Sequence, residues 1–187
     1  IFNGNIVEVE KLCDLITRSG LCIRWSAKVS VRKEMTPELL RKMRKAGCVS
    51  LAYGVESGSP AVLKDMRKNP DLEIVKKVIK DTHDAGILVH CFFIIGYPTE
   101  SEEDFLMTLD FIRQNANHIH RFDQITGCHI EDDSYLGLNP DKYGIVFKEV
   151  FIRQQKFLEA MIELYKNENK RFSMGQNSIT VAEEKLN

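Results

Sequence analysis

The residues best placed for chemistry follow an apolar stretch near the middle of the chain. Glu56 and Ser57 come directly after the run CVSLAYGV at 48–55, and Gly58 then turns the backbone toward a helix that Ser59-Pro60 would begin. A carboxylate at this point accepts hydrogen bonds from hydroxyl or ammonium groups of a ligand, and free amides of the new helix can face an anion. The spacing equally allows a glutamate that only caps the next helix.

A second candidate follows the next apolar stretch, GILVHCFFIIG at 86–96. Gly96 leaves the backbone bare before Tyr97-Pro98, which permits close approach by a flat ligand or a positive φ. Ile94 could then cover one face of an aromatic ring. The competing interpretation is a tight turn with Ile94 in the core.

Cysteine and histidine spacing matches no metal-site signature. The five cysteines are separated by 9, 26, 43 and 37 residues, unlike zinc or iron–sulfur ligands. We expect four of them to be small buried residues of strands: Cys22, Cys48, Cys91 and Cys128. His118 and His120 would share one face of an extended segment, but no third ligand is near. They are therefore interpreted as surface or helix-end residues.

Composition and charge narrow the classes of partner. The 187 residues include 26 basic and 27 acidic side chains, so the net charge is close to zero. The chain therefore has no strong positive electrostatic potential that would attract nucleic acid or an anionic membrane. No apolar run approaches the roughly 18 residues that a membrane span needs. An odd number of cysteines argues against a disulfide framework and for a reducing compartment, so the cytoplasm is expected.

Strand-like and helix-like stretches alternate along the chain. Strands are predicted at 22–31, 48–55, 87–95 and 121–130, and helices at 36–46, 59–66, 71–85 and from 101 onward. This alternation predicts an α/β fold with a parallel sheet, whose functional groups gather at the carboxyl ends of its strands. A loop-like stretch at 132–146 precedes a long predicted helix at 147–167.

Three segments, taken together, resemble one family. They are Trp25 to Arg32 followed by MTPELLRKMRKAG, then YGVESGSPAVLKDMRK, then FFIIGYPTESEEDF. In this order they resemble the radical S-adenosylmethionine (SAM) enzymes, especially the branch often fused to a cobalamin-binding domain. The resemblance implies a partial (β/α)6 barrel, with strands 3–6 in residues 1–147 and a helical extension and tail in 148–187.

The resemblance also implies roles for particular residues. Glu56 would contact the ribose or methionyl part of SAM, the adjacent Ser57 would also belong to the cofactor site, and Lys68 would lie near the SAM carboxylate. Ile94 and Gly96 fall on a GxIxGxxE motif that packs on adenine, and Gln124 lies in the strand whose backbone would bind the adenine edge. The motif departs here, because Phe92 replaces its first glycine and Glu100 lies one place beyond its glutamate.

The family's CxxxCxxC loop, which holds a 4Fe–4S cluster, is missing from this sequence. The chain also begins with Ile1 instead of Met. We therefore expect a fragment whose cluster ligands, first two barrel strands and any cobalamin domain belong to an upstream half of the same protein. Alone it would be inactive in the family's radical chemistry, hydrogen abstraction or methyl transfer on an unknown small-molecule substrate. Its unpaired sheet edge would favour self-association.

Two other functions remain open. One is a cluster-free binding or scaffold module with the same fold. The other is an unrelated α/β-barrel enzyme that uses Glu56 as acid or base. Such an enzyme needs a second residue to exchange a proton with Glu56. His90 is poorly placed for this, because we expect it to be buried in the middle of a strand.

Overall fold

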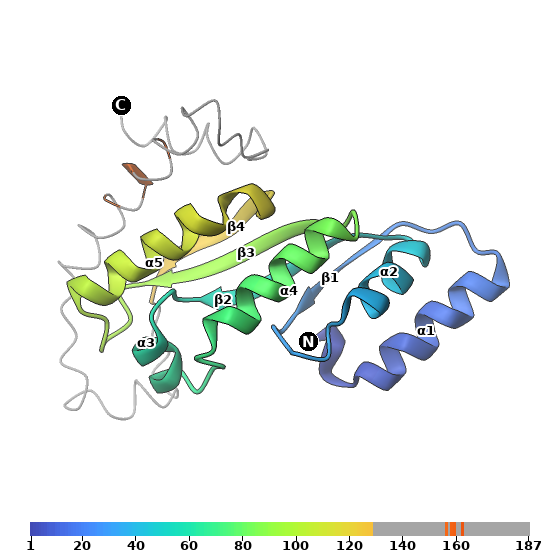
Figure 1. Cartoon of the computed structure of the whole chain (residues 1–187), viewed down its shortest axis with the longest axis horizontal. Helices are drawn as coiled ribbons and strands as arrows, with labels where there is room; N and C mark the ends of the chain where they lie inside the picture. Colours follow the sequence, from blue (N-terminus) through green and yellow to red (C-terminus); the bar gives the residue numbers. More distant parts are fainter. Residues whose placement is uncertain (129–155, 157, 160–161, 163–187) are drawn as a thin grey trace.

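The computed structural model describes residues 1–128 and, beyond them, residues 156, 158, 159 and 162. Its framework is one sheet of four parallel strands in the spatial order β1-β2-β3-β4 (Figure 1). The strands are β1 Trp25–Val29, β2 Cys48–Glu56, β3 Leu88–Ile95 and β4 Arg121–Gly127. The predicted α/β fold with a parallel sheet is confirmed.

Helices connect the strands in the predicted alternation. They are η1 Phe2–Gly4, α1 Ile6–Ser19, α2 Pro37–Lys45, α3 Pro60–Asp65, α4 Leu72–Asp84, α5 Glu102–Asn115 and η2 Ala116–His118. Side-chain caps fix where they begin, because each cap satisfies amides that the first turn leaves free. Thr36 and Ser59 cap α2 and α3, Asp71 caps α4, and Ser101 forms a capping box with Asp104 at α5. None of the described helices is long and apolar enough to cross a bilayer.

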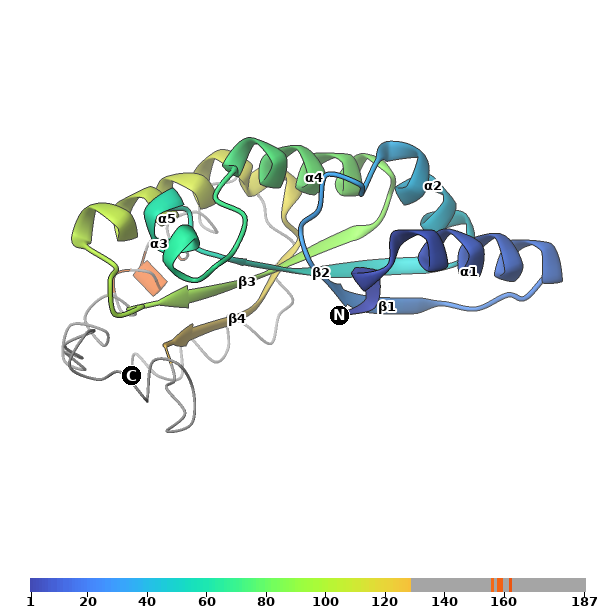
Figure 2. The ribbon, with the colours of Figure 1, turned by 90° about the horizontal axis from the view of Figure 1, so that it is seen from below.

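Helices α1 to α5 lie on one face of the sheet (Figure 2). Alternate residues of β3 therefore meet different surroundings. Val89, Cys91, Phe93 and Ile95 are buried against the helices, while His90, Phe92 and Ile94 are only half-buried on the opposite face. In the part of the chain described, no helix covers that opposite face, which we call the open face.

Three expectations about the strands were wrong. β1 is shorter than the predicted 22–31, so Cys22 lies before it and is exposed. β4 ends at Gly127, so Cys128 follows it and is only half-buried. His90 is half-buried on the open face instead of buried. Trp25, the first residue of β1, packs on the Phe2 ring at 5.2 Å between centroids, and its Nε1 donates to the Ala46 carbonyl at 2.8 Å.

The C-terminal expectations lie largely outside the described residues. The loop at 132–146 and the final tail cannot be compared, and within 147–167 the four described residues are helical. One of them, Lys156, forms a 2.6 Å ion pair with Glu102 in the first turn of α5.

Candidate functional site

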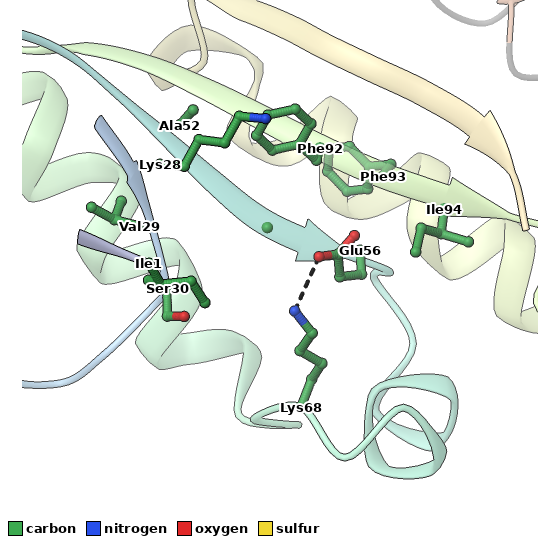
Figure 3. A pocket seen from close by; sticks show the side chains of 11 residues that line it. Ile1, Lys28, Val29, Ser30, Ala52, Glu56, Lys68, Phe92, Phe93 and Ile94 are labelled. Atoms are coloured by element: carbon green, nitrogen blue, oxygen red, sulfur yellow. Dashed lines mark hydrogen bonds and ion pairs between the residues drawn. The ribbon is translucent and has the colours of Figure 1, made fainter. Parts of the chain in front are cut away.

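Glu56 ends β2 in an unusual backbone conformation. Its φ is +69°, in the left-handed region that costs a residue with a Cβ about 1–2 kcal/mol. The strand pairing between β2 and β3 also shifts register here, between Gly54 and Glu56. The bend turns the carboxylate toward Lys68, whose Nζ donates to Oε1 at 3.1 Å (Figure 3). The Glu56 side chain is 14% exposed and that of Lys68 is 44% exposed, so the pair stands at a boundary with solvent.

Lys68 reaches this place because of how α3 ends. Arg67 adopts a φ of +56°, and the Lys68 amide donates back to the Leu63 carbonyl at 2.8 Å. This is the pattern of a Schellman motif, in which a left-handed residue closes the helix. The positive φ of Arg67 is thus explained by helix termination, whereas that of Glu56 lies at a strand end.

Gly54 provides the space for this ion pair. A Cβ at position 54 would lie 2.5 Å from Glu56 Oε1 and 3.6 Å from Lys68 Nζ. Any larger residue would therefore displace the carboxylate from its present position.

The loop after Glu56 is anchored to α5 by a buried polar network. Ser57 is fully buried, and its hydroxyl lies 3.1 Å from that of Thr108, which also accepts from the Gly58 amide at 2.9 Å. The Ser59 hydroxyl donates to Asp104 at 2.5 Å. Ser57 therefore faces α5 and does not line the cavity beside Glu56.

The turn after β3 is closed by Glu100. Gly96 has a φ of +75°, and its amide donates to Glu100 Oε2 at 2.8 Å. The Glu100 amide in turn donates to the Tyr97 carbonyl at 2.8 Å. The one-place offset of Glu100 in the sequence motif thus still brings its carboxylate to Gly96.

A cavity of about 310 Å³ opens on the open face beside Glu56 (Figure 3). Its lining comes from the first three strands, the residue after β1, the loop after α3 and the first residue of the chain: Ile1, Lys28, Val29, Ser30, Ala52, Gly54, Glu56, Lys68, Phe92, Phe93 and Ile94. The structure thus brings together three of the predicted site residues, Glu56, Lys68 and Ile94. Gly96 and Ser57 lie outside this lining. The backbone of Gln124 pairs with Phe92 in the next strand.

Lys28 and Phe92 line the cavity but were not predicted as site residues. The Lys28 Nζ lies 5.2 Å from the centroid of the Phe92 ring. The available signal was strand alternation, since Lys28 is two residues before Ser30 and Phe92 two before Ile94, both on the cavity side.

The described residues do not fit an iron–sulfur cluster or a metal ion. Within them, no three His, Cys, Asp or Glu side chains are grouped closely enough to bind a metal. Burial raises the pKa of Cys13 to about 11 and that of Cys48 to about 12, which keeps both thiols protonated at neutral pH. His118 and His120 instead pack around His83, each with its ring centroid 5.3 Å from that of His83.

Comparison with known proteins identifies relatives of this chain. The model of the Radical SAM superfamily matches residues 5–112. Bacteriochlorophyllide d C-12(1)-methyltransferase of Chlorobaculum tepidum is 29% identical over 77% of this chain and 34% of its own length. A tRNA-2-methylthio-N(6)-dimethylallyladenosine synthase of Thermoanaerobacter sp. is 38% identical over 44% of this chain and 18% of its own length. The chain therefore spans 34% and 18% of the lengths of these two relatives.

Solved structures share the fold. Coproporphyrinogen III oxidase (HemN) from Escherichia coli, a radical SAM enzyme, superposes with a TM-score of 0.68 at 17% identity, over 85% of this chain and 37% of its own. The radical SAM methyltransferase TsrM from Kitasatospora setae, with cobalamin and a [4Fe-4S] cluster bound, gives a TM-score of 0.56 at 16% identity, over 68% of this chain and 26% of its own.

Proposed function

Because this chain belongs to the radical SAM superfamily, we propose that its open face is the SAM-binding side of an enzyme of radical chemistry, either hydrogen abstraction or methyl transfer. The observation that carries this proposal is the Glu56–Lys68 ion pair, 3.1 Å apart, at the wall of the open-face cavity. The methyltransferase and methylthiotransferase relatives support a group-transfer reaction.

The ion pair has the right charges for the polar end of SAM. Glu56 would accept from the ribose hydroxyls or the methionyl ammonium, and Lys68 would donate to the methionyl carboxylate. Exchanging the internal pair for ligand contacts is inexpensive, since a partly exposed ion pair contributes only about 0–1 kcal/mol. Ile94, on the same cavity wall, would cover the adenine ring, with the backbone near Gly96 and Gln124 at its edge.

The cluster needs ligands that this sequence does not provide. With an iron–sulfur cluster beside it, SAM supplies a one-electron route to breaking unactivated C–H bonds. No CxxxCxxC occurs in the 187 residues. We propose that an upstream half of the same protein contributes the cluster, that this half pairs with the edge of β1 that no described strand occupies, and that the chain alone is inactive. The cobalamin bound to TsrM makes cobalamin a further candidate cofactor of that half.

Anaerobic reconstitution tests the proposed division between the upstream half, which would bind the cluster, and this chain, which would bind SAM. The chain is incubated with iron and sulfide, and bound metal and sulfide are then measured together with SAM binding by isothermal titration. We expect no stoichiometric cluster, but SAM binding that Glu56→Gln weakens about tenfold, as the loss of a charge-assisted hydrogen bond implies. A stoichiometric cluster on this chain would refute the division.

A cluster-free binding module is the second candidate. It is favoured by the sequence itself, because its 187 residues contain no CxxxCxxC that could hold a cluster. The two proposals differ in one measurement. A polypeptide with a CxxxCxxC loop is added to the chain, reconstituted and reduced with dithionite. More 5′-deoxyadenosine then forms from SAM than with that polypeptide alone only if this chain is part of an enzyme. We place both candidates in the cytoplasm, acting on a small molecule.

A further inference from the structure

The open face holds a second cation, which the proposed SAM site does not use. Lys28 is exposed on β1, and its register partner is Ala52 in β2. Ala52 lies four residues before Glu56, which corresponds to about 13 Å along a strand. In Figure 3 the Lys28 ammonium extends across β2 toward Phe92, whereas Lys68 approaches Glu56 from the opposite side.

No residue that the structure describes neutralises the charge of Lys28. Among the described residues its ammonium makes no hydrogen bond or ion pair, and its one contact is the Phe92 ring, at 5.2 Å from the centroid. A cation over an aromatic face gains only about 0.5–1 kcal/mol at an exposed site and keeps all three of its N–H donors. Lys28 is therefore held in place by its stem and the ring while its donors are available to a ligand.

The surroundings of Lys28 leave space for that ligand. Ala52 and Gly54, the residues of β2 between Lys28 and Phe92 in the pairing, have the smallest side chains on this face. Because these residues are small, they leave space above the strand for the cavity of about 310 Å³. A concave, partly apolar wall strengthens the field of a single charge, because less water screens it.

We propose that Lys28 and Phe92 form a subsite for an oxyanion of the substrate, a carboxylate or a phosphate attached to the molecule that the enzyme modifies. This subsite rests on the proposed function, because only an enzyme would have a substrate to bind there. Lys28 binds the anion, Phe92 positions the lysine and covers an apolar part of the same molecule, and the Glu56–Lys68 pair binds SAM one step nearer the carboxyl ends of the strands.

Titration of the full chain with two simple anions tests the subsite. Uniformly 15N-labelled protein is titrated with inorganic phosphate and, separately, with acetate at constant ionic strength, and amide shifts are followed by NMR. We expect saturable shifts centred on Ala52 and Phe92. Lys28→Met keeps the apolar stem and should weaken binding about tenfold. Lys28→Arg, and Lys45→Met on the exposed side of α2, should stay within about twofold of wild type.

The anion that binds more tightly indicates which group of the substrate Lys28 binds: acetate indicates a carboxylate, and inorganic phosphate indicates a phosphate. The subsite is refuted if neither anion binds, if Lys28→Met binds both as wild type does, or if the shifts centre on Arg67 and Lys68 instead. SAM binding is measured on the same samples. It should be unchanged in Lys28→Met, and a loss there would assign Lys28 to the SAM site. If wild-type protein binds the anions but not SAM, the subsite stands and the proposed function fails.

Discussion

The helix-covered face and the open face of the sheet are built from alternate residues of the same strands, yet they do different work. On the covered face, side chains such as Tyr53 and Phe93 are completely or almost completely buried. On the open face, the alternate positions carry Lys28, Gly54 and Glu56, with a left-handed backbone at Glu56. The covered face stabilises the fold, and the open face can therefore hold a strained conformation at Glu56 and a cation, Lys28, that no described residue pairs with.

Phe93 and Phe92 are neighbours on opposite faces, and truncating each should give the largest contrast. Phe93 is 1% exposed and packs on Phe111 and Phe122, with ring centroids 6.4 and 5.9 Å away. Phe93→Ala should lower the free energy of unfolding by about 3–5 kcal/mol. Phe92→Ala should lower it by less than about 1 kcal/mol. Urea denaturation measures both, and equal losses would contradict the division of the two faces.

Gly58 tests how firmly the covered side anchors the loop that follows Glu56. A Cβ there would lie 2.6 Å from the Thr108 Cα and 2.7 Å from the Met107 carbonyl oxygen, neither of which can move aside cheaply. Gly58→Ala should cost about 1–3 kcal/mol of stability. Gly4→Ala is the matched control, because a Cβ at Gly4 meets nothing within 4 Å. A stable Gly58→Ala variant would show that the loop is not anchored as described.

Glu56 tests whether the open face trades stability for binding. Glu56→Gly relieves the positive φ, so it should keep the free energy of unfolding unchanged or raise it by up to about 1 kcal/mol, although the ion pair is lost. SAM binding should nevertheless disappear. Arg67→Gly relieves a similar φ of +56° without removing the carboxylate, and its SAM binding should persist. Thermal melts with titration calorimetry measure both, and a marked destabilisation of Glu56→Gly would contradict the strain.

The histidines that pack against α4 give the smallest effect, a pH dependence of stability. Burial lowers the pKa of His118 and of His120 from 6.5. His83, His90, Asp84 and Lys80 also act on one or both of them. The unfolded chain then binds more protons below about pH 6.5, so stability is full above that pH and falls as the pH decreases. His118→Phe should flatten this decline in urea titrations between pH 7 and 5, and an unchanged slope would exclude His118 as a source.

Local signals explain how much of the fold the sequence could predict. The caps Thr36, Ser59, Asp71 and Ser101 act within one helical turn, so the starts of these four helices were predicted correctly. Strand alternation with helices was sufficient for a parallel sheet. The first strand was predicted too long. Cys22 is of a residue type common in buried strands, but in the structure it is exposed and pairs with no residue of β2.

The site was harder to predict because its contacts are long-range. Ser57 looked like a ligand residue, but Thr108, 51 residues away, draws its hydroxyl toward α5. The Glu56–Lys68 contact depends on a left-handed Arg67, a conformation that an arginine does not signal in a sequence. The resemblance to a family placed both residues near SAM, and only the structure shows that they meet each other.

The most direct test of the central claim is SAM binding to four versions of the full chain, followed by 15N NMR. The Glu56–Lys68 assignment requires saturable shifts around Gly54, Glu56 and Ile94 in the wild type. It also requires affinity about tenfold weaker in Glu56→Gln and in Lys68→Met, with Lys45→Met like the wild type. Equal binding by all four proteins, or shifts confined to the helix-covered face, would contradict it.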